Sequence, residues 1–169
     1  MSLKNKDLIY HLYDIFKSYV KTGPKVINKK LNKLTKGLHT DFCFSTFKYP
    51  VLDWFIEDYY IKVNNKNIKI VPKNSFDKLT SVSLAFWIMD DGSFNYIKGN
   101  LTLCTDSYSR EEVLYLISIL RDKYNLSCGL INYKKTKSGL NSYRIRINKK
   151  SKPYLIEITK PYFIPSMLY

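Results

Sequence analysis

The residues of this sequence that are best placed to do chemistry are two adjacent carboxylates, Asp90 and Asp91, followed by Gly92. Six consecutive apolar residues, 84–89, precede them, so the stretch predicts a buried helix that ends at the carboxylates. The C-terminal end of a helix carries roughly half a negative charge, so each acidic residue there destabilises it by about 0.3–1 kcal/mol. A divalent metal would offset that charge. The alternative is an Asp-Gly turn that does no more than end a core helix.

The predicted helix has no polar face, and a helix of this kind must be packed on several sides. Its start is marked by three candidate N-caps, Thr80, Ser81 and Ser83. Gly92 is predicted to end it as a C′ residue in a left-handed turn. Ala85 is small enough to let a second helix approach closely. We therefore expect a central helix at an interface, with its carboxylates at the far end.

The string 84–92 resembles the signature of the LAGLIDADG homing endonucleases. The better-defined positions of that signature are matched by Leu84, Ala85, Asp90, Asp91 and Gly92. The resemblance implies that Asp91 binds a catalytic Mg²⁺ and that Asp90 contributes to the metal site less directly, through its backbone carbonyl. It also implies that Leu84, Ala85 and Ile88 lie where two motif helices pack together. Without catalysis, no cofactor is expected.

The same resemblance implies an α+β fold in which each repeat has the order αββαββα. The antiparallel sheet of each repeat would form a saddle over the DNA major groove. Lys69, just before the Val71-Pro72 connection into the motif helix, matches the basic residue that stabilises charge near the scissile phosphate. The alternative for Lys69 is an ordinary surface lysine in a lysine-rich loop.

Turn residues and hydrophobic spacing after the motif helix independently predict two strands, a helix, two strands and a helix. The expected elements are strands 94–96 and 101–105, a helix that starts at the capping box Ser109–Glu112 and runs to Tyr124, strands 128–134 and 141–148, and a helix that starts at Pro153 and ends before Lys160.

Residues 1–72 read as a partial copy of that unit, with a helix, two strands, a second helix and a linker. At an offset of about 102 residues, 41–47 matches 143–149, and the helix at 51–60 matches 153–162. We expect a partial first repeat at 1–72 and a complete second repeat at 73–169. The first motif helix would then precede Met1, and the segment after the closing helix would also be shortened.

The net charge of +14 is the strongest global feature, and the basic residues are spread along the chain. A basic folded surface favours a polyanion, most commonly nucleic acid, although a merely soluble basic protein is the alternative. No apolar run is long enough to span a membrane, so no membrane partner is expected. Most aromatic residues fall at apolar-periodic positions, and we expect Trp54, Phe55, Phe86 and Trp87 in the core.

Strand 143–148 alternates between apolar and polar side chains, which predicts one buried and one open sheet face. The expected nucleic-acid contacts on the open face are Arg144, Arg146 and Asn148, and those at the adjacent turn are Lys134, Lys135 and Lys137. Arginine's planar fork suits guanine edges and phosphates alike. Plain solvent exposure is the alternative for this face.

Cutting both strands requires one carboxylate from each of two motif helices, and this sequence supplies Asp91 only. We therefore expect a nucleic-acid-binding protein that derives from a Mg²⁺-dependent site-specific DNA endonuclease and does not cut both strands alone. One interpretation is an endonuclease completed by a second chain or by self-association. Another is an RNA-binding protein, either an intron maturase or an organellar ribosomal component that binds rRNA. A third is a DNA-binding regulator.

The use of lysine, asparagine, isoleucine, tyrosine and phenylalanine suggests an AT-rich genome, and hence a mitochondrial or other organellar origin. Such an origin would explain why no targeting peptide is recognisable at the start of the sequence. The three cysteines, Cys43, Cys104 and Cys128, are odd in number and far apart, so we expect them to be reduced.

Overall fold

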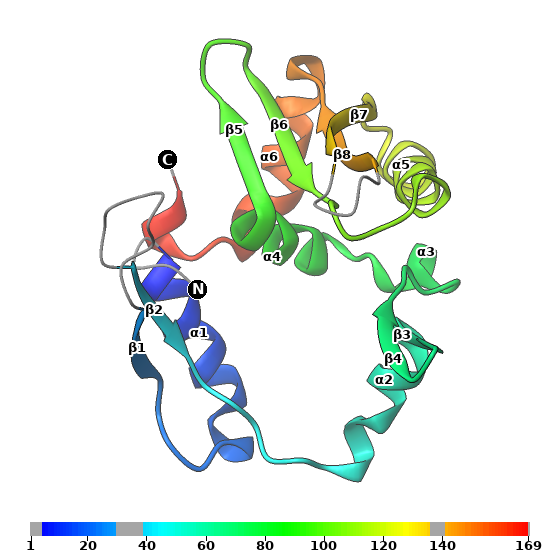
Figure 1. Cartoon of the computed structure of the whole chain (residues 1–169). Coiled ribbons are helices and arrows are strands. Elements are labelled where there is room, and N and C mark those ends of the chain that lie inside the picture. Colours follow the sequence, from blue (N-terminus) through cyan, green and yellow to red (C-terminus); the bar gives the residue numbers. More distant parts are fainter. Residues whose placement is uncertain (1–4, 30–38, 136–140, 169) are drawn as a thin grey trace. The chain divides into compact units, whose positions relative to one another are not determined.

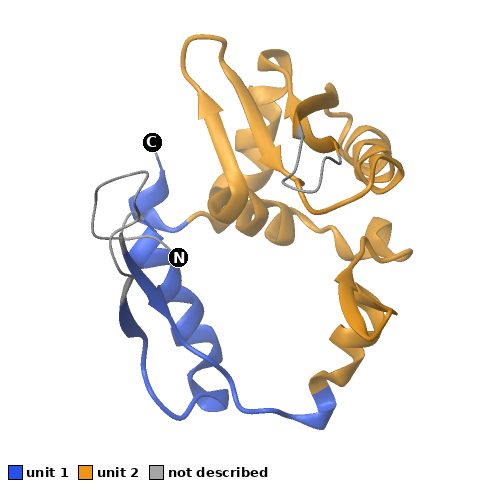
Figure 2. Ribbon diagram, in the orientation of Figure 1, with its two compact units in different colours: residues 1–51, 164–169 blue, residues 52–163 orange. Residues whose placement is uncertain are grey.

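The structure, a computed structural model, describes residues 5–29, 39–135 and 141–168. The chain forms two compact units, one of residues 1–51 with 164–169 and one of residues 52–163 (Figure 2). The repeat boundary expected near residue 72 concerns sequence repetition and stays a prediction.

The first unit contains a helix and a pair of antiparallel strands (Figure 1). Its elements are α1 (Lys6–Phe16), β1 (Lys25–Lys29) and β2 (His39–Cys43), with 3₁₀ turns at Lys17–Tyr19 and Pro165–Met167. Its small apolar core includes Leu8, Ile9 and Phe42. The predicted order of a helix and two strands is confirmed for this part of the chain.

The second unit carries the motif helix and a four-stranded sheet (Figure 1). Its elements are α2 (Asp53–Tyr59), β3 (Tyr60–Val63), β4 (Lys66–Lys69), α3 (Ser75–Lys78), α4 (Ser81–Asp91), β5 (Gly92–Asn95), β6 (Asn100–Cys104), α5 (Arg110–Tyr124), β7 (Cys128–Lys135), β8 (Asn141–Ile147) and α6 (Lys152–Thr159). Short 3₁₀ turns lie at Lys149–Ser151 and Lys160–Tyr162, and another, Pro50–Leu52, lies where the two units join in sequence. From α4 onward the order is αββαββα, which confirms the predicted α+β fold.

The sheet is antiparallel throughout, with the strand order β5-β6-β8-β7. Because successive side chains of a strand alternate in direction, one face carries Leu103, Ile145 and Ile147, all at most 1% exposed. These residues share one hydrophobic core with α4, α5 and α6. The opposite face of the sheet, which we call the open face, carries Thr102, Arg146 and Gly129, which are paired across three neighbouring strands.

The motif helix α4 is central, as predicted. Leu84 and Ala85 are completely buried, and Thr80 caps the helix by accepting a hydrogen bond from the backbone N–H of Ser83 at 3.2 Å. The left-handed turn predicted at Gly92 is wrong, because its φ of −76° and ψ of 140° are extended. Glycine is needed there for another reason: any Cβ would overlap the carbonyl oxygen of Ile88.

Ahead of α4, the β3–β4 hairpin was not predicted by the sequence analysis. Asn64 and Asn65 form its turn with φ values of 48° and 60°, the left-handed backbone that a tight hairpin turn requires. The core positions predicted for Trp54 and Phe55 are wrong, since these rings are 45% and 44% exposed. They lie on the short helix α2 and stack on each other with centroids 3.8 Å apart. No described helix is both long and apolar enough to cross a membrane.

Candidate catalytic half-site and nucleic-acid interface

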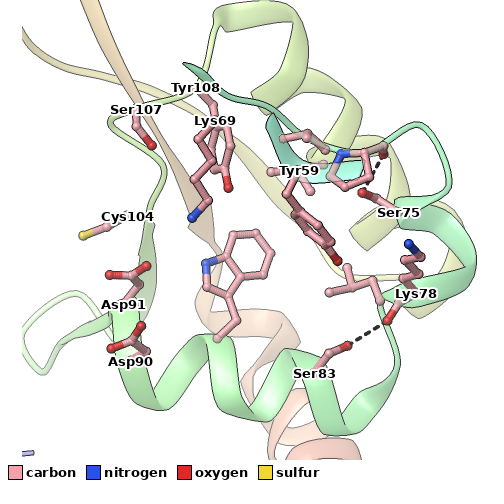
Figure 3. A pocket seen from close by; sticks show the side chains of 15 residues that line it. Tyr59, Lys69, Ser75, Lys78, Ser83, Asp90, Asp91, Cys104, Ser107 and Tyr108 are labelled. Carbon is pink, nitrogen blue, oxygen red and sulfur yellow. Dashed lines mark hydrogen bonds between the residues drawn. The ribbon is translucent and has the colours of Figure 1, made fainter. Parts of the chain in front are cut away.

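The C-terminal end of α4 opens into a pocket of about 320 Å³, shown in Figure 3. Asp90 and Asp91 lie at one side, and Lys69 reaches in from the end of β4 with its ammonium group directed toward Asp91. The remaining lining residues are Tyr59, Val71, Pro72, Ser75, Lys78, Leu79, Ser83, Trp87, Cys104, Ser107, Tyr108 and Leu116. The fold therefore brings together the three residues predicted for catalysis and metal binding.

The electrostatics around Asp91 suit a cation. Burial raises the pKa of the Asp91 carboxyl, the negative charge of Asp90 raises it further, and the positive charge of Lys69 partly opposes both. Two adjacent carboxylates are the hard oxygen ligands that Mg²⁺ takes, commonly one or two from the protein with water and phosphate oxygens completing the shell. Among the described residues no group of three or more His, Cys, Asp or Glu side chains forms a closed metal cage. The residues present thus fit an open Mg²⁺ site.

Lys69 stays fully cationic in this pocket. Burial lowers the pKa of its ammonium group, but its interactions with Tyr108, Tyr60 and Asp91 outweigh that effect, and the pKa is raised. The Lys69 Nζ lies 5.5 Å from the centroid of the Tyr108 ring. A charged ammonium held beside the carboxylates can stabilise negative charge that develops on a phosphate.

Helix α5 holds the connecting segment, residues 70–80, that joins the Lys69 strand to the motif helix. The Glu112 carboxylate accepts the backbone N–H of Val71 at 2.8 Å with one oxygen and that of Ser109 at 2.7 Å with the other. The second contact belongs to the predicted capping box of Ser109 and Glu112, which is confirmed. The same carboxylate therefore caps the N-terminus of α5 and holds the backbone at Val71, two residues after Lys69.

Three further α5 side chains contact the connecting segment, and each donates to a backbone carbonyl. The donors and acceptors are Tyr115 Oη to Lys73 at 2.6 Å, Lys123 Nζ to Phe76 at 2.6 Å, and Tyr124 Oη to Leu79 at 2.5 Å. A neutral hydrogen bond contributes roughly 0.5–1.5 kcal/mol, and one from a charged donor such as Lys123 roughly 1.5–3 kcal/mol. These contacts hold the backbone that joins Lys69 to the motif helix.

On the open face Arg144 is held from two sides. Its Nε and Nη2 donate to the two carboxylate oxygens of Asp106 at 2.7 and 2.6 Å. Its guanidinium carbon lies 3.4 Å from the centroid of the Tyr133 ring. Hydrogen bonding from Arg144 lowers the pKa of Asp106, and Arg144 in turn contributes to the electrostatic environment of Asp91. This cluster therefore borders the pocket.

The other predicted nucleic-acid contacts fall in different settings. Arg146 is exposed, on the row of Thr102 and Gly129, whereas Asn148 donates to the hydroxyl of Ser127 at 2.8 Å. Lys134 is exposed, with its Nζ 4.9 Å from the Tyr133 centroid. Lys137 and the side chain of Lys135 lie outside the described residues. Contact with nucleic acid stays a prediction for all of them.

The residues predicted for the motif-helix interface are buried or partly buried. Leu84 belongs to its hydrophobic core, Ile88 packs against that core, and Ala85 is fully buried. Contact of these residues with a second motif helix stays a prediction. The three cysteines are free thiols, as predicted.

Sequence reasoning missed Asp106, Tyr133 and the second role of Glu112. Asp106 contacts Arg144 across 38 positions of sequence, and Glu112 contacts Val71 across 41. No local pattern encodes either pair. The register of β6 against β8, which places Cys104 opposite Arg144, is the signal that would have brought Asp106 near Arg144.

Comparison with known proteins gives a consistent result. A sequence profile described as the LAGLIDADG DNA endonuclease family matches residues 1–155. Cytochrome b mRNA maturase bI2 of Saccharomyces cerevisiae is 32% identical over 169 residues, which cover 98% of this chain but only 38% of the maturase. Probable intron-encoded endonuclease 1 of Wickerhamomyces canadensis is 34% identical over 171 residues, covering 98% of this chain and 69% of that protein. Intron-encoded endonuclease ai4 of Dictyostelium discoideum is 33% identical over 163 residues, covering 92% of this chain and 96% of that protein.

The fold also matches a solved structure, that of the homing endonuclease I-WcaI bound to its DNA recognition sequence. The TM-score is 0.81 with 31% sequence identity, and the match covers 99% of this chain and 71% of the other. The expectation drawn from residues 84–92 is confirmed: the chain belongs to the LAGLIDADG DNA endonuclease family.

Proposed function

We propose that this protein binds a specific duplex DNA site with the open face of its sheet and supplies half of a phosphodiester-cleaving centre. The observation that carries the proposal is the pocket shared by Asp91 and Lys69, which lies beside the strand bearing Arg144 and Arg146. A carboxylate pair, a cationic lysine and a basic sheet face are the parts that positioning and hydrolysing a phosphodiester require.

In this proposal Asp91 and Asp90 hold Mg²⁺, and Lys69 stabilises the charge on the scissile phosphate. When bound, Mg²⁺ supplies a Lewis acid for the phosphate and a water of lowered pKa. A carboxylate and a lysine from a second motif helix would complete the cut in the other strand. These would come from further polypeptide of the same protein or from a second chain, since the present sequence contains one such set.

DNA binding is tested by selecting from a pool of random duplexes with the purified chain in Ca²⁺. We expect a discrete site to be enriched, and its affinity should fall steeply between 50 and 200 mM salt because Lys and Arg displace condensed counterions, roughly one per neutralised phosphate. Failure to enrich any duplex, or an affinity that does not change with salt, would contradict the proposal.

Cleavage is tested on a supercoiled plasmid that carries the selected site, in Mg²⁺. With the chain alone we expect binding without linearisation, because one half-site cannot cut both strands. A fusion that adds a second motif helix from a relative should linearise the plasmid, and Asp91→Asn or Lys69→Met in that fusion should abolish the cut without abolishing binding. Loss of binding in these variants would place the two residues in recognition instead.

Binding to an intron transcript or another structured RNA is the second candidate, and the maturase relatives favour it: two cytochrome b mRNA maturases bI2 are 32% and 34% identical to this chain. On this view the chain would act in an organelle, on its own intron or on rRNA. Cross-linking in cells of the native source, followed by sequencing of the bound nucleic acid, separates the outcomes. Recovery of intron or ribosomal RNA without DNA would replace the endonuclease proposal.

A further inference from the structure

The Arg144 side chain is restrained in a way that its neighbour Arg146 is not. Asp106 occupies the Nε and Nη2 donors of Arg144, and the Tyr133 ring lies against the flat side of the guanidinium. Arg146, two residues along the same strand, makes no such contact with any described residue. Only 18% of the Arg144 side chain is exposed, whereas Arg146 counts among the exposed residues.

A guanidinium has five N–H donors, arranged along a side edge and an end edge. The side edge of Arg144, made by Nε and one hydrogen of Nη2, is bonded to Asp106. The end edge, made by Nη1 and the other hydrogen of Nη2, has no acceptor among the described residues. Two parallel donors in a fixed plane match the O6 and N7 acceptors that guanine presents in the major groove.

The charge beside Arg144 decides between a base and a phosphate as its target. The Asp106 carboxylate is 42% exposed on the same face, and hydrogen bonding from Arg144 keeps its pKa low, so it stays ionised. A phosphate that approached Arg144 would be repelled by this carboxylate. A guanine edge is neutral and meets no such repulsion.

We propose that Arg144 is a guanine-reading residue and that Asp106 and Tyr133 are positioning residues that orient its free edge, while Arg146 serves as an adaptable phosphate contact. This inference rests on the proposed function, because it requires duplex DNA on the open face. Preorganisation is the physical gain: a side chain already fixed by two partners loses less conformational entropy when it binds a base. The guanine would lie close to the pocket, since Arg144 pairs with Cys104 across the sheet and Cys104 lines that pocket.

The test is the duplex selection repeated with wild type, Asp106→Asn, Arg144→Lys and, as a matched control on the same strand, Arg146→Lys. Asp106→Asn removes one acceptor oxygen and the negative charge, so charge alone would tighten binding to every duplex. If Asp106 orients Arg144, the substitution should have a different effect. One guanine position in the selected site should become degenerate, with about a 5- to 150-fold loss of discrimination against other bases.

Arg144→Lys keeps the charge but loses the planar fork, so it should relax the same position. Arg146→Lys should leave the base preferences as they are. Thermal unfolding of each variant before the selection shows whether it is folded. If one variant unfolds, the other still tests the same position.

The proposal is overturned if no position depends on both Asp106 and Arg144, or if Arg144→Lys weakens all duplexes equally. If the wild type enriches a site but that site is unaltered in these variants, this inference fails and the proposed function stands. If the wild type enriches no duplex, both fail.

Discussion

Lys69 and Asp91 face each other across one pocket although they belong to different elements, the end of β4 and the end of α4. Their charges are coupled, since Lys69 lowers the pKa of Asp91 and Asp91 raises the pKa of Lys69. The pairing brings the end of a hairpin and the end of a buried helix together at one pocket.

Replacement of Lys69 by methionine should separate metal binding from catalysis. Without the ammonium charge, Mg²⁺ should bind more tightly, by about 0.2–1 kcal/mol or up to about fivefold, because a partly exposed charge pair contributes no more than that. Cleavage by a completed two-motif fusion should nevertheless fall. Isothermal titration with Mg²⁺ measures the first effect and plasmid linearisation the second. Weaker Mg²⁺ binding in Lys69→Met would contradict the pocket electrostatics; Lys73→Met, outside the pocket lining, is the control.

Asp91→Asn should stabilise the metal-free protein. The folded state raises the pKa of Asp91, so it holds the proton more tightly than the unfolded chain does, and the ionised carboxylate opposes folding as pH rises through the raised value. At neutral pH we expect the substitution to raise Tm by about 1–4 °C, from roughly 0.3–1 kcal/mol at the helix end. Calorimetry should show a smaller difference in Tm between the variant and the wild type at pH 4 than at pH 7. Added Mg²⁺ should raise the Tm of the wild type and leave that of the variant unchanged.

Truncation of a side chain on α4 should lower the free energy of unfolding strongly only where that side chain is buried. Leu84 is completely buried in the core cluster, so Leu84→Ala should lower the free energy of unfolding by about 2–5 kcal/mol. Val82 on the same helix is 42% exposed, and Val82→Ala should change the free energy of unfolding by no more than about 0.5 kcal/mol. Chemical denaturation measures both. Equal losses would mean that α4 is not packed as described.

Gly92→Ala should destabilise the protein although Gly92 has an ordinary backbone conformation. The added methyl group would overlap the Ile88 carbonyl, and relief of that overlap should cost about 1–3 kcal/mol. Gly129 is the matched control, since a Cβ there meets nothing within 4 Å. Gly129→Ala should leave the denaturation midpoint nearly unaltered. A tolerated Gly92→Ala would show that the end of α4 can shift to make room.

Glu112→Gln should loosen the connecting segment. The amide keeps one acceptor oxygen in place of two, so either Val71 or Ser109 loses its partner, at roughly 1.5–3 kcal/mol for a hydrogen bond to a charged group. Amide hydrogen exchange should show faster exchange at Val71. The neighbouring Glu111 is exposed in the first turn of α5, and Glu111→Gln should leave Val71 protected. Unchanged protection at Val71 in Glu112→Gln would argue against the contact.

The fold of the second unit was predictable because its signals are local. The Ser109 capping box, the alternation in β8 and the Pro-containing start of α6 are each readable within a few residues, and each is confirmed. The β3–β4 hairpin was missed because its turn is Asn64-Asn65 rather than a glycine-containing pair, and because all eight of its strand residues are exposed. An exposed hairpin lacks the alternation between buried and open positions on which strand prediction depends.

The candidate site was predictable only in part. Asp90 and Asp91 follow from their place at the end of an apolar run, and Lys69 followed from the family resemblance. The partners of Arg144 did not follow, because Asp106 and Tyr133 reach it through strand register and not through sequence spacing. The reason predicted for glycine at position 92 was also wrong. Glycines that end helices commonly adopt a left-handed turn, whereas here the close approach of the Ile88 carbonyl leaves no room for a Cβ.

The five hydrogen bonds by which α5 holds the connecting segment all end on main-chain atoms: one amide hydrogen and four carbonyl oxygens. Every amino acid except proline offers both groups, so these hydrogen bonds do not depend on which side chains stand at Lys73 and Asp77. Exchange of an exposed residue in this segment, such as Lys73, should therefore leave Lys69 and Asp91 in the same pocket.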